Sequence, residues 1–225
     1  MRSLPDLIRL AGEREMDLHE AILAADSEAT GVPSEQIFEL ISSRLKDMRR
    51  SAEEASCSNN PCRMVPKTGP LLRGYSKKGG MCGGFILKAS AIALEVATYN
   101  ASMGRIVAAP TAGSCGILPG MLFAWEEFYG KDAADKERKL TEALVVAGAV
   151  GEIIANRATL AGAEGGCQAE CGAAAAMGSA ALVYLQGGTC EAVSNAVALT
   201  LKSVLGLVCD PVGGLVESPC IKDRK

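Results

Sequence analysis

The stretch CQAECGAAAAMGSAALVYLQ, residues 167–186, decides the fold class of this chain. It shows no alternation of apolar and polar residues, and alanine, which has the highest helix propensity, fills much of it. Helices built from alanine and glycine carry few large side chains, so neighbouring helices can approach them closely. We therefore predict a buried helix within a core of small residues.

The rest of the chain repeats this composition, because alanine and glycine make up 60 of its 225 residues and aromatic residues only nine. Apolar residues at helical spacing predict further helices at residues 85–100, 117–129, 140–156 and 190–205. No run has the period of two that is typical of strands. The sequence predicts an all-α, Ala/Gly-rich buried helical domain.

We expect residues 1–225 to form one domain in three parts. Residues 1–50 contain amphipathic helices, residues 51–83 hold three prolines and five glycines and predict a loop-rich segment, and residues 84–225 form the helical core.

Two details of the N-terminal part can be predicted. Ser3 is a candidate cap of the first helix, with Pro5 in its first turn. The single histidine, His19, lies beside Glu20 on an amphipathic helix and is predicted at the surface.

Charge and hydropathy exclude two classes of partner. A net charge of −3 gives no overall attraction to phosphate, so nucleic acid is not expected. Residues 106–125 are uncharged and long enough to cross a membrane, but Pro110 and Pro119 interrupt any helix there.

The N-terminus is charged, unlike a signal peptide. Nine cysteines cannot all pair, which favours thiols in a reducing cytoplasm.

Three cysteines stand apart, because Cys167, Cys209 and Cys220 each lie where a predicted helix meets irregular backbone. Their spacing matches no common zinc or ferredoxin motif, and cysteines are often only small apolar residues. Three soft thiolates without histidine would nevertheless suit an iron–sulfur cluster better than a hard cation.

The loop APTAGSCGILPG, residues 109–120, is a second candidate site. Its small residues expose backbone amides, and Thr111 and Ser114 add hydroxyl donors. If a helix starts at Ile117, its positive end would favour an anion such as a carboxylate. A tight connection between two helices explains the same residues equally well.

Three segments, NASMGRIVAAPTAGSCGILPG (100–120), TLAGAEGGCQAECGAAAAM (159–177) and LGLVCDPVGGLVESPC (205–220), closely resemble the alpha subunit or alpha domain of iron–sulfur-dependent L-serine dehydratase, also called L-serine ammonia-lyase. The resemblance implies an all-α domain with a cluster-binding loop region. It implies a [4Fe–4S] cluster held by Cys167, Cys209 and Cys220. It also implies that the substrate carboxylate binds at Thr111, Ala112, Gly113 and Ser114.

The same resemblance implies a lyase that converts L-serine to pyruvate and ammonia, with the open iron of the cluster acting as a Lewis acid on the substrate hydroxyl. The family's histidine motif belongs to a beta subunit and is absent here, so a beta partner is expected to supply the general base. The catalytic residues of this chain itself remain unassigned.

Two departures from the family pattern leave alternatives open. Residues 66–80 read PKTGPLLRGYSKKGG instead of a SGLTGGDA-like stretch, and family subunits continue beyond the final PC motif, so we expect a shortened subunit. A related elimination on cysteine or threonine is one alternative function. A truncated, non-catalytic iron–sulfur paralogue is another, and a purely structural helical protein is a third.

Overall fold

The computed structural model describes residues 3–60, 67–131 and 134–208, and every regular element in these ranges is a helix. This confirms the predicted all-α class. The helices are α1 (Leu4–Glu13), α2 (Leu18–Thr30), α3 (Ser34–Cys57), α4 (Thr68–Ser76), α5 (Gly83–Ala101), α6 (Ile117–Tyr129), α7 (Lys136–Arg157), α8 (Gly162–Gly165), the π-helix η1 (Gln168–Gly172), α9 (Ala173–Leu185) and α10 (Cys190–Ser203).

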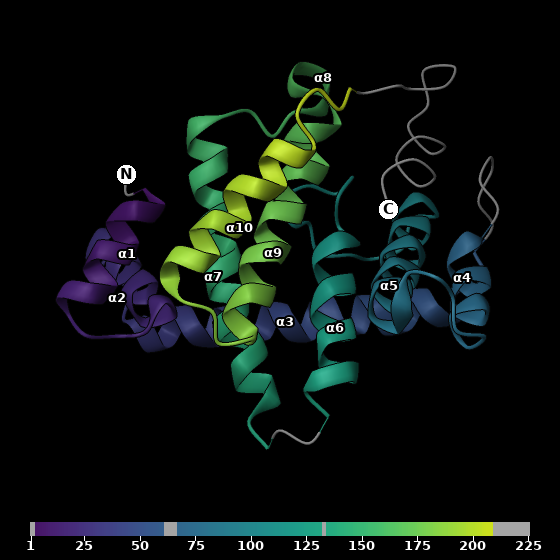
Figure 1. Cartoon of the computed structure of the whole chain (residues 1–225), viewed down its shortest axis with the longest axis horizontal. Helices are drawn as coiled ribbons and strands as arrows, with labels where there is room; N and C mark the ends of the chain where they lie inside the picture. Colours follow the sequence, from purple (N-terminus) through teal and green to yellow (C-terminus); the bar gives the residue numbers. More distant parts are fainter. Residues whose placement is uncertain (1–2, 61–66, 132–133, 209–225) are drawn as a thin grey trace.

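The long helix α3 runs along the length of the molecule, and α6 and α7 cross it and extend to both sides of it (Figure 1). It packs against α5, α6 and α7, and α9 lies between α7 and α10. The pair α1 and α2 covers one end of α3, and α4 and α5 cover the other. The turn between α8 and η1 lies at one end of the layer that α7, α9 and α10 form, away from α3 (Figure 1).

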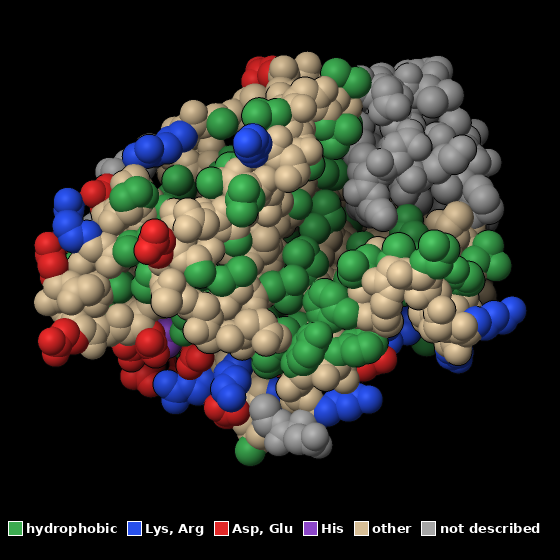
Figure 2. All heavy atoms as spheres, viewed as in Figure 1, with side chains coloured by type: hydrophobic (Ala, Val, Ile, Leu, Met, Phe, Trp, Pro, Cys, Tyr) green, Lys and Arg blue, Asp and Glu red, His purple; other side chains and the backbone are tan. Residues whose placement is uncertain are grey.

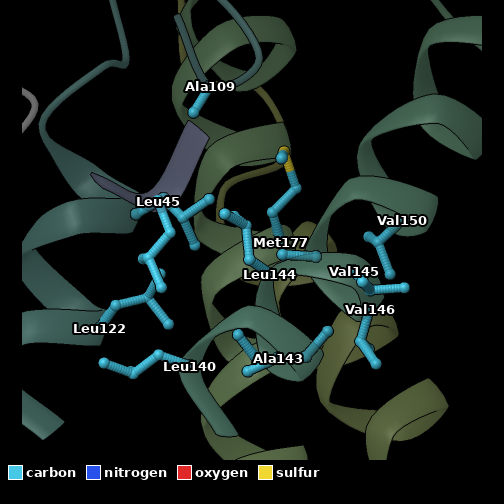
Figure 3. Close-up of a cluster of buried hydrophobic side chains, with 14 of the residues drawn as sticks. Leu45, Ala109, Leu122, Leu140, Ala143, Leu144, Val145, Val146, Val150 and Met177 are labelled. Carbon is cyan, nitrogen blue, oxygen red and sulfur yellow. The ribbon is translucent and has the colours of Figure 1, made fainter. Parts of the chain in front are cut away.

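The core follows the small-residue pattern predicted for residues 167–186. Ala173, Ala174, Ala176 and Ala180 on α9 are completely buried. Larger side chains from α3, α6 and α7 join this helix in one hydrophobic cluster, in which Figure 3 shows Leu144 beside Met177, with Leu45 and Leu122 farther along. The small residues thus let α9 lie deep between its neighbours, as expected.

The first helix begins as the sequence predicts. The Ser3 hydroxyl accepts a hydrogen bond from the Asp6 amide, and the Asp6 carboxylate accepts one from the Ser3 amide, which completes a capping box. Pro5 lies in the first turn. Both contacts satisfy amides that would otherwise have no partner at the helix start.

The prediction for His19 is wrong, because its side chain is buried. Its Nδ1 lies 2.8 Å from the hydroxyl of Tyr184, and its Nε2 lies 3.8 Å from the Glu142 carboxylate. The charged neighbour Glu20 suggested an exposed face, but α2 packs against α7 at its first turn. The histidine therefore joins the N-terminal pair of helices to the core.

The loop-rich prediction for residues 51–83 is wrong in part. Helix α3 continues to Cys57, because Ser51 and Ala55 extend its buried stripe by whole turns. A further helix, α4, packs on α5, where Arg73 forms an ion pair with the buried Glu95 carboxylate. Gly69, Pro70 and Gly74 lie within α4, so its local composition predicted a loop.

Within residues 3–60, 67–131 and 134–208, no helix is both long enough and apolar enough to span a membrane.

Candidate active site

A close crossing of two helices fixes the loop 102–116, which connects α5 to α6. A Cβ atom added to Gly116 would lie 2.2 Å from the carbonyl oxygen of Ala93, and one added to Gly120 would lie 2.5 Å from that of Ala89. Only glycine permits such an approach, so α6 starts directly against α5. As predicted, α6 begins at Ile117, and the loop lies at its positive end. The loop carries the four predicted substrate-binding residues Thr111, Ala112, Gly113 and Ser114.

Hydrogen bonds within this loop hold its backbone in one shape. The hydroxyls of Thr111 and Ser114 lie 3.1 Å apart, and Ser114 is completely buried. The Asn100 side-chain amide donates to the carbonyl of Ala112, at a distance of 3.0 Å. Ser114 therefore supports the loop from inside, whereas Thr111, Ala112 and Gly113 are at least partly accessible.

A carboxylate that the sequence did not single out, Glu170, meets this loop. The Thr111 hydroxyl donates to Oε1 of Glu170, at a distance of 2.7 Å. Glu170 lies in the π-helix η1, three residues after Cys167 in GGCQAEC. Single turns of π-helix occur frequently at functional sites. The place of Glu170 within GGCQAEC could have drawn attention to it, but nothing local predicts its contact with Thr111, which lies 59 residues away in the sequence.

The Cys167 side chain is buried at the start of η1, and its thiol donates to the carbonyl of Val208. Two further bonds hold the same chain segment: the amide of Gln168 donates to Leu207 at 3.1 Å, and the amide of Gly206 donates to the Gln168 side chain at 2.8 Å. Residues 206–208, which lead to Cys209, are thus held against Cys167 and Gln168.

The other two predicted cluster ligands, Cys209 and Cys220, lie outside the described residues. Among the residues that the structure describes, no three His, Cys, Asp or Glu side chains gather as a metal site would require. Helix α10 ends at Ser203, two residues before the end of the predicted helix 190–205. Cys167 itself fits a soft metal, because a buried thiol is a suitable ligand for iron–sulfur clusters.

A cavity of about 440 Å³ lies between α1, α7 and α10, and Gln168 and Ala169 of η1 form part of its wall. Its lining includes Leu4, Ile153, Ile154, Val197 and Leu201, so it is almost entirely apolar. Arg157, Thr159 and Gln168 also line it, but apolar side chains dominate, so it suits a small polar substrate poorly. The Thr111 loop and Glu170, which bring hydroxyl groups and a carboxylate together, are better suited to bind such a substrate.

The sequence profile of the family described as "Serine dehydratase alpha chain" matches residues 13–223. The chain belongs to this family. It is 39% identical over 228 residues to the "Probable L-serine dehydratase, alpha chain" of Bacillus subtilis, a match that covers 98% of this chain and 73% of the relative. It is 38% identical over 218 residues to the "L-serine dehydratase, alpha chain" of Peptoniphilus asaccharolyticus, covering 96% and 73%.

Longer relatives match part of this family member. The "L-serine dehydratase" of Mycobacterium tuberculosis is 44% identical over 131 residues, which are 58% of this chain and 28% of the relative. The family assignment confirms the resemblance drawn from the three sequence segments. In this family member, the Thr111 loop and the Cys167 segment meet through Glu170.

Proposed function

We propose that this chain is the alpha subunit of an iron–sulfur L-serine ammonia-lyase that converts L-serine to pyruvate and ammonia. The observation that carries the proposal is the hydrogen bond between Thr111 and Glu170, which joins the predicted substrate loop to the segment that bears Cys167. A substrate bound at the loop would thereby lie beside the chain that holds the cluster. The names of the relatives support the same reaction.

The proposed cofactor is a [4Fe–4S] cluster on Cys167, Cys209 and Cys220. The buried Cys167 thiol supports it, as does its contact with Val208, which immediately precedes Cys209 in the sequence. Three thiolates form a soft donor set that suits iron. When bound, such a cluster would supply an iron that lacks a protein thiolate and acts as a Lewis acid on the substrate hydroxyl.

The chain's own residues would bind and orient the substrate. Thr111, Ala112 and Gly113 lie in a loop at the positive end of α6, which favours the carboxylate of serine. The buried Ser114 would hold the loop in shape, because its hydroxyl lies within 3.1 Å of that of Thr111. A fixed carboxylate would set the direction in which the Cα proton points.

A beta subunit is the proposed partner, and it would supply the general base. The single histidine of the chain, His19, is buried against Tyr184 and Glu142 and lies in a different part of the fold. Hydrophobic side chains gather on the face in front of α6 and α9 (Figure 2). The half-exposed rings of Phe128 and Tyr129, with Phe85 beside them, offer apolar surface to a partner chain. The proposed location is the cytoplasm.

Anaerobic co-expression with a beta-type chain, followed by an assay of pyruvate release from L-serine, tests the proposal. We expect turnover by the complex and none by the alpha chain alone. L-Threonine and L-cysteine serve as comparison substrates, and a higher kcat/KM for either would replace serine as the substrate.

Iron and sulfide analysis tests the cofactor separately. Cys167→Ser, Cys209→Ser and Cys220→Ser should each lower the iron and sulfide content, while the matched control Cys190→Ser at the start of α10 should leave both unchanged. A cluster that survives all three replacements would rule out this ligand set. A cluster without turnover in the complex would favour a non-catalytic iron–sulfur protein.

A further inference from the structure

The carboxylate of Glu170 lies in a position that the fold has made room for. A Cβ atom added to Gly113 would lie 2.9 Å from its Oε1, and one added to Gly162 would lie 2.4 Å from its Oε2. Each oxygen is therefore flanked by a glycine whose missing side chain leaves the space. Thr111 fixes the orientation with its 2.7 Å hydrogen bond.

The charge of this carboxylate has no cationic partner in the described chain. None of the ion pairs formed among residues 3–60, 67–131 and 134–208 includes Glu170. An ionised carboxylate accepts about four hydrogen bonds, and the Thr111 hydroxyl supplies one of them. Glu170 is only partly buried, so a small cation could reach the remaining positions.

The geometry of an α-amino acid matches this arrangement. Its carboxylate carbon and its ammonium nitrogen are bonded to the same Cα, about 2.5 Å apart. A substrate whose carboxylate is held by the Thr111 loop would thus present its ammonium group next to the side chain that Thr111 contacts. An ammonium group donates strong, charge-assisted hydrogen bonds to a carboxylate.

We propose that Glu170 binds the α-ammonium group of the substrate and so makes the site selective for amino acids over hydroxy acids. This inference rests on the proposed function, because it takes the Thr111 loop as the place where the substrate carboxylate binds. The ammonium group would lie between two carboxylates, that of the substrate and that of Glu170, and would offset their repulsion.

The test compares the binding of L-serine with that of 3-hydroxypropanoate, in which hydrogen replaces the amino group. Pyruvate release by the anaerobically purified complex with the beta-type chain gives the KM of L-serine, and 3-hydroxypropanoate, added as a competitive inhibitor of that reaction, gives its inhibition constant. Glu170→Gln keeps the shape of the side chain and removes its charge. We expect it to weaken L-serine binding by about 10- to 100-fold. Binding of 3-hydroxypropanoate should stay the same or become tighter, because the variant removes the repulsion between the two carboxylates.

Glu164→Gln is the matched control, because Glu164 is a nearby exposed carboxylate that also accepts a hydrogen bond from a threonine, Thr159, at 2.8 Å. It should change the binding of neither ligand. Retained binding of 3-hydroxypropanoate by Glu170→Gln also shows that the loop is folded. If that variant fails to fold, Glu170→Asp is the alternative, because its shorter side chain keeps the charge but moves it away from the substrate ammonium group. The preference for L-serine should then fall.

Each outcome decides the inference. Unchanged L-serine affinity in Glu170→Gln, or an equal loss of both ligands in a folded variant, would overturn it and leave Glu170 a structural partner of Thr111. Failure of the proposed function has a different signature: the wild-type complex itself would neither bind L-serine nor release pyruvate from it, and the inference would fall with it.

Discussion

The crossing of α5 and α6 predicts opposite effects for the same substitution at two glycines. Gly120 lies in α6, and an added Cβ would approach the Ala89 carbonyl oxygen to 2.5 Å. Gly148 lies on the exposed side of α7, and an added Cβ would meet nothing within 4 Å. Gly120→Ala and Gly148→Ala therefore differ in steric surroundings but share the gain in helix propensity.

The magnitudes follow from the contact distances. Ordinary contacts of a Cβ begin at 3.4 Å, so Gly120→Ala forces α5 and α6 apart by about 0.9 Å. Overpacking against backbone costs about 3 kcal/mol, and the gain in helix propensity offsets about 1 kcal/mol of it. The free energy of unfolding should fall by about 2 kcal/mol in Gly120→Ala, and should rise by about 0.5–1 kcal/mol in Gly148→Ala.

Thermal and urea unfolding of the two variants measure this difference. For a chain of this length the expected change in Tm is roughly −4 to −8 °C for Gly120→Ala and roughly +1 to +4 °C for Gly148→Ala. The single tryptophan, Trp125, is buried on α6, so its fluorescence reports on the crossing itself. Equal or greater stability of Gly120→Ala relative to Gly148→Ala would refute the steric argument.

Three other predictions concern the core and its charges. Leu122→Ala, at a fully buried position, should lower the free energy of unfolding by about 2–5 kcal/mol, whereas Leu199→Ala, at an exposed one, should change it by less than about 0.5 kcal/mol in urea titrations. Arg73→Ala should cost about 3 kcal/mol, because it leaves the buried Glu95 carboxylate without its cation; Arg73→Lys should restore part of that loss. Burial, and secondarily a nearby carboxylate, raises the pKa of Tyr184 above its usual range, so its contribution to stability is complete below about pH 10 and is lost as the pH rises further. Unfolding measured from pH 9 to 11 should therefore show a shallower decline in Tyr184→Phe than in the wild type.

Most helices could be predicted from the sequence because their signals are local. The segment 117–129 matches α6 from end to end, and Ser3 caps α1 as expected. The two helical parts within residues 51–83 could not, because their stability comes from tertiary contacts. Helix α4 is short and contains Gly69 and Pro70, and it packs on α5 around the ion pair of Arg73.

The sequence predicted the motifs of the candidate site but not how their side chains are arranged in space. Thr111 and Cys167 could be selected from their local sequence and from the family resemblance. The side chain of Glu170 could not, because nothing in the local pattern indicates that residue 170 meets residue 111. The burial of His19 was concealed for the same reason, since its partner Tyr184 lies 165 residues away.

The four residues 167–170 bring together two chain segments that are remote in sequence. Cys167 and Gln168 hold residues 206–208 through three hydrogen bonds, and Glu170 holds the Thr111 loop through another. These contacts span 59 and 41 residues, and closing such long loops costs conformational entropy, which the packing of a rigid element must offset. Buried α9, which continues directly from η1, supplies that framework. The alanine-rich stretch that determines the fold class is therefore also what holds Cys167 and Glu170 at fixed positions relative to the Thr111 loop.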